Sequence, residues 1–118
     1  MLLKILKSKI HRATVTEAQL DYTGSIAIAS DLMKAASILP YESVLVADLN
    51  NGNRVETYAV PAKAGSGDIV VMGAAAKLIK PGHLVIILSF ALMTPAQAGK
   101  FKPKVIVLGK NNKIIKRR

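Results

Sequence analysis

Serine, threonine, lysine, tyrosine and carboxylate side chains are the nucleophiles available to this 118-residue chain, because it contains no Cys. The absence of Cys also excludes a disulfide framework, a thiolate metal site and an iron–sulfur cluster. No G-x-S-x-G elbow occurs, and the two histidines, His11 and His83, have neither a triad partner nor a zinc-site spacing. The glycine-containing stretches GSG at 65–67 and GAAAK at 73–77 match neither a P-loop nor a dinucleotide fingerprint. The common catalytic motifs are therefore missing.

Five short segments nevertheless follow one another in a distinctive order and spacing. They read KIHR at 9–12, DYTGS at 21–25, NGNRVETY at 51–58, GAAA at 73–76 and GHLVII at 82–87. A Tyr-x-Gly-Ser sequence alone is a weak indication, but together with NGxRxxTY and GAAA at these separations it is specific. Over about residues 1–95, the sequence resembles the aspartate decarboxylase family, whose pyruvoyl-dependent enzymes make β-alanine.

The resemblance implies a fold, an assembly and a self-cleaving precursor. The fold is mainly β, a six-stranded double-psi β-barrel with one or two short helices, in a single domain over residues 1–118. Such chains usually assemble as homotetramers with active sites between subunits. The precursor cleaves itself between Gly24 and Ser25 into a β chain (1–24) and an α chain (25–118), and Ser25 becomes a covalent pyruvoyl group.

The implied reaction is the decarboxylation of L-aspartate to β-alanine and CO₂, a step toward pantothenate and coenzyme A. The pyruvoyl ketone accepts the electrons that are released as CO₂ leaves, so it acts as an electron sink. The residue types are consistent with self-cleavage, because a glycine allows the strained backbone in which the Ser25 hydroxyl approaches the Gly24 carbonyl. The chemistry requires no metal and no external cofactor.

The resemblance also assigns a role to each matching residue. The catalytic residues are Ser25 as the source of the pyruvoyl group, Gly24 at the cleaved bond, Thr57 as the donor to the oxyanion and Tyr58 as the proton donor. The substrate-binding residues are Lys9 and Arg54, which bind the carboxylates, with Thr57, Gly73, Ala74 and Ala75. The supporting residues are His11 and Tyr22 near the processing site, Ile86 at the pocket wall, and Met72.

Met72 departs from the family pattern, which usually has Asn at this position. Asn can hydrogen-bond near the pyruvoyl group, whereas Met offers only a weak acceptor. The substitution bears on the rate and completeness of self-cleavage. It also leaves open an alternative, a structural member of the same family that does not process itself.

Short β-branched runs separated by turn residues predict the elements that must position these side chains. Strands are expected at 2–6, 10–15, 23–29, 43–49, 54–60, 69–72, 84–90 and, as the last one, 105–108. One helix is expected over 31–39, ended by Pro40. The sequence NNGN at 50–53 predicts a hairpin with a type I′ turn, because Asn-Gly accepts positive φ.

The formal net charge of +10 is concentrated at the two ends of the chain. Residues 1–12 carry four Lys or Arg and residues 100–118 carry eight, both without an acid, whereas residues 13–99 have a net charge of −2. We interpret 100–118 as a solvated, partly frayed basic tail. A small basic β-barrel that binds nucleic acid is the second alternative. It is the weaker one, because only 4% of the residues are aromatic and single-strand binders use stacking platforms.

The sequence predicts a cytoplasmic protein without a membrane partner. Lys4, Lys7 and Lys9 interrupt any apolar signal-peptide core near the N-terminus. The longest apolar stretch, 84–93, is about half the length that a membrane-spanning helix needs.

Overall fold

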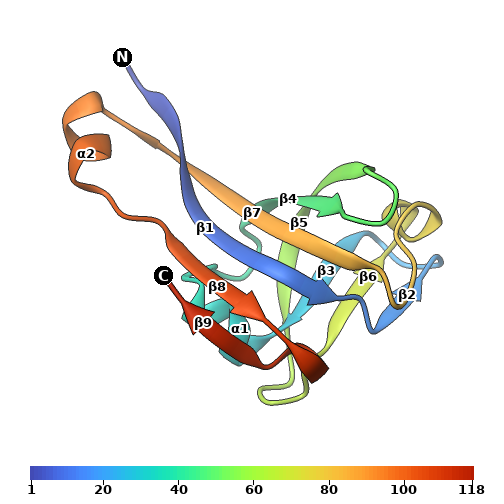
Figure 1. Cartoon of the computed structure of the whole chain (residues 1–118). Helices are drawn as coiled ribbons and strands as arrows, with labels where there is room; N and C mark the ends of the chain where they lie inside the picture. The colour runs from blue at the N-terminus through green and yellow to red at the C-terminus, as the bar shows by residue number, and fades with distance from the viewer.

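Strands β1 (Leu3–Thr14) and β7 (Leu84–Met93) form a long antiparallel ribbon that extends beyond the body of the protein toward α2 (Figure 1). The computed structural model describes all residues, 1–118. The other elements are β2 (Glu17–Gln19), β3 (Ser25–Ala29), α1 (Ser30–Ala35), β4 (Ser43–Asp48), β5 (Arg54–Ala62), β6 (Ile69–Met72), the 3₁₀ helix η1 (Ala74–Lys77), α2 (Pro95–Lys100), β8 (Lys104–Leu108), the 3₁₀ turn η2 (Lys110–Asn112) and β9 (Ile114–Arg117).

All nine strands belong to one mixed sheet with the order β2-β6-β3-β5-β4-β7-β1-β8-β9. The pairs β1–β8, β2–β6 and β3–β5 are parallel, and the other neighbours are antiparallel. The prediction of a mainly β fold is confirmed. No pairing joins β2 to β9, so the closed six-stranded double-psi barrel is not confirmed and stays a prediction. No helix of the structure combines the length and the apolar character needed to cross a membrane.

The core lies on one face of this sheet, called here the inner face, where β-branched side chains alternate with outward-facing ones. Ile10 of β1, Ile87 of β7 and Val46 of β4 pair across three strands, and each is at most 1% exposed. Their neighbours Lys9 and Leu88 lie on the opposite, outer face and are half-buried. The outer face therefore carries side chains that the core does not use.

Helix α1 covers Ser30–Ala35 and is shorter than the predicted 31–39. The helix ends before Pro40 is reached, because Ser37 takes a left-handed φ of +58° and turns the chain. Proline was therefore not the residue that stopped the helix.

Strands β4 and β5 form the predicted hairpin, but the prediction of a type I′ turn between them was wrong. A type I′ turn needs positive φ at two adjacent residues, and Gly52 (φ +78°) is the one loop residue that has it. The Gly52 N–H donates to the Asp48 carbonyl at 2.9 Å, which closes a wider loop. Ala47 opposite Arg54 is the last pair before this loop.

The basic segment 100–118 is part of the sheet, so the prediction of a frayed tail was wrong. Strand β8 pairs with β1, and a further strand, β9, pairs with β8. Ile106 and Leu108 alternate inward and are 1% and 3% exposed. Asn112 bonds through its side chain to both the N–H and the carbonyl of Thr14 at 2.8 Å. The lysines of this segment are exposed, but its backbone and apolar side chains are fixed.

We expect Ile106→Ala to lower the free energy of unfolding by about 2–5 kcal/mol, because it leaves a cavity in the core. Ile115→Ala is the matched control, since Ile115 is 69% exposed and its truncation should cost less than about 1 kcal/mol. Denaturant unfolding of the two variants measures the difference. Equal, small losses would show that β8 does not contribute to the core.

Candidate active site

Ser25, the predicted source of the pyruvoyl group, is the first residue of β3 and lies between β6 and β5. It pairs with Met72 of β6 and is only 3% exposed. On the other edge, the parallel register pairs Ile26 with Ala59. One residue earlier on each strand, Ser25 therefore lies beside Tyr58 on the same face of the sheet. The structure brings these three predicted site residues, Ser25, Tyr58 and Met72, together.

The bond predicted to be cleaved is packed against Gly73. Gly24 has a φ of +91° and Gly73 a φ of +87°, in the left-handed region that favours glycine. A Cβ added to Gly73 would lie 2.6 Å from the Cα and 2.9 Å from the N of Gly24, closer than such atoms can approach. The Gly73 N–H donates to the Gln19 carbonyl at 2.8 Å, which holds this approach in place. Only glycine fits at position 73 without displacing Gly24.

Two further predicted residues adjoin this contact. The Tyr22 carbonyl lies 3.1 Å from the position of the added Gly73 Cβ, so the Tyr22 backbone is at the site although the residue is 56% exposed. Ala74 and Ala75 directly follow Gly73 and begin η1. The predicted segments 21–25 and 73–76 are therefore one local unit, built by the ends of β3 and β6.

Strand β5 places Thr57 and Tyr58 on opposite faces of the sheet. Thr57 pairs with the buried Val44 and faces the core, whereas Tyr58 lies on the outer face. No hydrogen bond of the structure involves the side chain of Ser25, Thr57 or Tyr58. The three hydroxyls are thus uncommitted, and the oxyanion role of Thr57 stays a prediction.

Lys9 lies on β1, which is not a neighbour of β3 in the sheet. Strands β5, β4 and β7 separate β3 from β1, which is four strand spacings, or roughly 19 Å along the sheet. Ile86 of β7 and Arg54 of β5 both pair with Ala47, so they share one row of the outer face between these two strands. The predicted site residues therefore form two groups. The Ser25 group contains Gly24, Ser25, Tyr58, Met72 and Gly73, and the Lys9 group contains Lys9 and His11 of β1. Arg54 and Ile86 lie on strands between the two groups.

His11 belongs to the second group and has an unusual environment. Its Nδ1 is buried and has no hydrogen-bond partner. Burial lowers the pKa of His11 below its usual value, and the positive charges of Lys9, Arg12 and Arg118 lower the pKa further. The imidazole is therefore neutral at pH 7, with a polar atom that the protein leaves unpaired.

Sequence reasoning assigned no role to Arg12, Lys116 or Arg118, yet they line a cavity of about 400 Å³ together with Lys9 and His11. The excess of Lys and Arg at both ends of the chain was the one indication available. Nothing in the sequence shows that β8 lies beside β1, which is what brings the two basic ends together.

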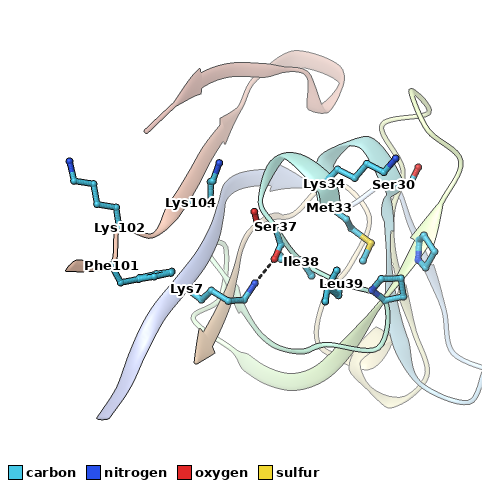
Figure 2. A pocket seen from close by; sticks show the side chains of 12 residues that line it. Lys7, Ser30, Met33, Lys34, Ser37, Ile38, Leu39, Phe101, Lys102 and Lys104 are labelled. Atoms are coloured by element: carbon cyan, nitrogen blue, oxygen red, sulfur yellow. Dashed lines mark hydrogen bonds between the residues drawn. The ribbon is translucent and has the colours of Figure 1, made fainter. Parts of the chain in front are cut away.

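The largest cavity, about 680 Å³, lies elsewhere, between α1 and the segment that leads into β8 (Figure 2). Met33, Ile38 and Phe101 contribute apolar walls, and Lys7 extends across it to donate to the Ser37 carbonyl. None of the predicted site residues lines this cavity. No three His, Asp or Glu side chains gather closely enough to hold a metal ion.

Comparison with known proteins extends the resemblance beyond the motifs. A family profile described as aspartate decarboxylase matches residues 1–115, so it includes β8 and reaches β9. Aspartate 1-decarboxylase of Acetivibrio thermocellus is 54% identical over 115 residues, which cover 98% of this chain and 91% of the relative. Aspartate 1-decarboxylase of Moorella thermoacetica is 54% identical over 110 residues, covering 93% and 86%.

A third relative, aspartate 1-decarboxylase of Pelotomaculum thermopropionicum, is 53% identical over 115 residues, covering 98% of this chain and 87% of its own. The family profile includes both the Ser25 group and the Lys9 group and extends through β8 into β9. The chain belongs to the aspartate decarboxylase family.

Proposed function

We propose that this protein decarboxylates L-aspartate to β-alanine and CO₂ with a pyruvoyl group made from its own Ser25. Membership of the family and the identity to enzymes named aspartate 1-decarboxylase support this carboxy-lyase reaction. The observation that carries the proposal is the approach of Gly73 to Gly24, where two left-handed glycines meet at the bond to be cleaved. A side chain at position 73 would collide with the backbone of Gly24, so the close approach of the two glycines is consistent with a special backbone geometry at the bond proposed to be cleaved.

Self-cleavage begins with attack of the Ser25 Oγ on the carbonyl carbon of Gly24. The attack exchanges the peptide bond for an ester, and β-elimination breaks the ester to leave a carboxylate on Gly24 and a dehydroalanine at position 25. Water then replaces the nitrogen of the dehydroalanine, which leaves as ammonia, and the ketone of the pyruvoyl group remains. Nothing lies within 4 Å of the place where a Gly24 Cβ would be, so it is the φ of +91°, and not lack of space, that favours glycine at position 24.

Two neighbours of Ser25 bear on the rate of this attack. Thr57 is the proposed donor to the negative oxygen that forms on Gly24, and it lies on the strand beside Ser25. Met72, opposite Ser25, offers only a weak acceptor and no donor. The attack therefore depends on the backbone geometry at Gly24 and on Thr57 more than on a second polar side chain.

The residues around Ser25 would hold the pyruvoyl group between β6 and β5. When present, its ketone accepts the electron pair released with CO₂. Tyr58, beside Ser25 on the outer face, returns a proton to the α-carbon. Lys9 and Arg54 bind the carboxylates of the substrate, and the backbone from Gly73 through Ala75 lines the pocket.

A homotetramer is part of the proposal, because no strand pairing within one chain joins the strand of Lys9 to that of Ser25. A second chain can supply Lys9 to the partner's Ser25 across a subunit contact. The projecting end of β7 offers an apolar surface for such a contact, with Phe90 36% and Leu92 66% exposed. We also place the reaction in the cytoplasm, since a chain without Cys is compatible with a reducing compartment.

Nucleic-acid binding is not favoured as the function. The basic C-terminal segment contains one aromatic residue, Phe101, so it lacks the stacking platforms of a single-strand binder. The family match also includes most of this segment. The non-processing alternative differs from our proposal in one measurable way, the covalent state of the chain.

We expect the chain to separate into fragments 1–24 and 25–118 in intact-mass spectra, and Ser25→Ala to stay whole and release no CO₂ from L-aspartate. The alanine lacks the oxygen that attacks Gly24 and becomes the ketone. Ser30→Ala, a serine on α1, is the control and should cleave normally. CO₂ release by the Ser25→Ala variant would contradict the pyruvoyl mechanism. A wild-type chain that stays uncleaved would favour the non-processing alternative.

We expect Gly73→Ala to slow self-cleavage at least tenfold, or by about 1.4 kcal/mol in the barrier, because the methyl group would displace Gly24. Gly82→Ala is a matched control, since Gly82 has nearly the same φ (+88°) but nothing within 4 Å of an added Cβ. The two variants carry a similar backbone strain. The rate of fragment formation separates them, and equal rates would contradict a role for the Gly73–Gly24 contact.

A further inference from the structure

The segment from Ser37 to Glu42, called here the 37–42 turn, connects α1 to β4 and folds back against β5. Ser37 and Tyr41 both take left-handed φ values, +58° and +69°. A positive φ is unusual for a residue as bulky as tyrosine, so the surrounding contacts must hold Tyr41 in this conformation. The proposed reaction as described so far uses none of the residues of this turn.

The 37–42 turn is hydrogen-bonded to β5 at one residue, Ala59. The Tyr41 N–H donates to the Ala59 carbonyl at 2.7 Å, and the Ala59 N–H donates to the Glu42 carbonyl at 3.0 Å. Ala59 directly follows Tyr58, and on its other edge β5 pairs with the strand of Ser25. The turn is therefore attached to the part of β5 that lies beside the candidate site.

The ring of Tyr41 contacts the ring of Tyr58. The two ring centroids are 6.2 Å apart and the ring planes are inclined by 35°, which is within the range of favourable aromatic pairs. The Tyr58 hydroxyl makes no hydrogen bond within the chain, so no polar contact selects a rotamer for this side chain. The contact with Tyr41 therefore limits the directions in which the Tyr58 hydroxyl can point.

The side chain of Glu42 anchors the turn to β1 and β7. The Nζ of Lys7 on β1 lies 3.0 Å from the Glu42 Oε2, and the hydroxyl of Ser89, a fully buried residue of β7, donates to the same oxygen. The other oxygen, Oε1, accepts from the Leu39 N–H at 3.0 Å. Lys7 also donates to the Ser37 carbonyl at the start of the turn (Figure 2). One carboxylate and its lysine partner thus hold both ends of the turn against the sheet.

Glu42 is ionised at pH 7 although its side chain is only 19% exposed. Burial alone would raise the pKa of this carboxyl, but the hydrogen bonds from Ser89, Leu39 and Lys7 outweigh the burial and hold the pKa below its usual value. Hydrogen bonds to a charged acceptor are stronger than those between neutral groups. The anchor is therefore strong at neutral pH.

We propose that Tyr41 and Glu42 are positioning residues for Tyr58, the Tyr41 ring by restricting the Tyr58 side chain and the Glu42 carboxylate by holding Tyr41 in place. This inference rests on the proposed function, in which Tyr58 returns a proton to the α-carbon. A proton donor must lie at hydrogen-bond distance from the atom that it protonates, so a displaced hydroxyl slows this step. The residues proposed to bind the carboxylates and to cleave the chain include neither Tyr41 nor Glu42. Their loss should therefore lower kcat and leave KM and self-cleavage unchanged.

We expect Tyr41→Ala to lower kcat for β-alanine formation about tenfold and to change KM by less than about twofold. Tyr41→Phe keeps the ring and should retain kcat within about twofold of wild type. Leu39→Ala is the matched control, because Leu39 is a 70% exposed residue of the same turn that lines the largest cavity. Wild-type kcat in Tyr41→Ala, an equal loss in Tyr41→Phe, or a rise in KM at unchanged kcat would each overturn the proposal.

The anchoring role of Glu42 is tested by Glu42→Gln, which keeps the length of the side chain and removes its charge. We expect this variant to lower kcat about threefold or more, with KM unchanged, because the turn is held less firmly. Thermal unfolding is measured in parallel to show that the variant is folded at the assay temperature. Wild-type kcat in folded Glu42→Gln would contradict the anchoring role.

The same geometry is tested without turnover by NMR of the full-length Ser25→Ala chain with labelled tyrosines, of which there are three. Cross-relaxation between the rings of Tyr41 and Tyr58 should be observed, should weaken in Glu42→Gln, and should persist in Leu39→Ala. If the wild-type chain does not cleave while this pattern is observed, the pyruvoyl function fails and the anchoring of Tyr58 stands. If the wild-type chain cleaves and forms β-alanine while Tyr41→Ala turns over like wild type, the positioning role fails and the pyruvoyl function stands.

Discussion

The structure depends on the hydrogen bonding of both edges of β1. One edge pairs antiparallel with β7 along the whole strand, and the other pairs parallel with β8 over residues 8–11. A strand that is bonded on both sides fixes the register of both neighbours. Through β7 it positions β4 and then β5, which carries Arg54, Thr57 and Tyr58. Through β8 it positions β9, so the location of almost every residue discussed above follows from this one strand.

Patterns within single elements were the part of this fold that the sequence could predict. The alternation in β4 and β5, the buried run of β6 and the glycines at 24 and 73 are local features, and they appear where expected. Two backbone details differ from the prediction. Helix α1 is shorter because Ser37 has a positive φ, and the loop at Gly52 is wider than the type I′ turn that Asn-Gly predicts. The backbone conformation of a single residue responds to tertiary contacts, which a local pattern does not show. The family motifs likewise identified the Ser25 group, whose members lie on adjacent strands.

Pairing between distant segments was the part that the sequence could not predict. Parallel pairing of His11 with Val107 joins residues at opposite ends of the chain, and no local periodicity encodes such a register. The β-branched run at 105–108 predicted β8, but the lysines around it indicated a frayed tail, so its pairing with β1 and the further strand β9 were not predicted. For the same reason, the sequence does not show that Arg12 and Arg118 line one cavity.

The division of the site into two groups separates the two chemical tasks of the proposed function. Gly24, Ser25 and Gly73, the residues proposed for self-cleavage, meet within one folded chain where β3 begins and β6 ends. Lys9, which the proposed function assigns to the carboxylates of the substrate, lies about four strand spacings away along the same sheet. No strand pairing within one chain joins the two groups, and in the proposed function a second subunit supplies Lys9. Processing would therefore depend on the fold of a single chain, whereas turnover would depend on the oligomer.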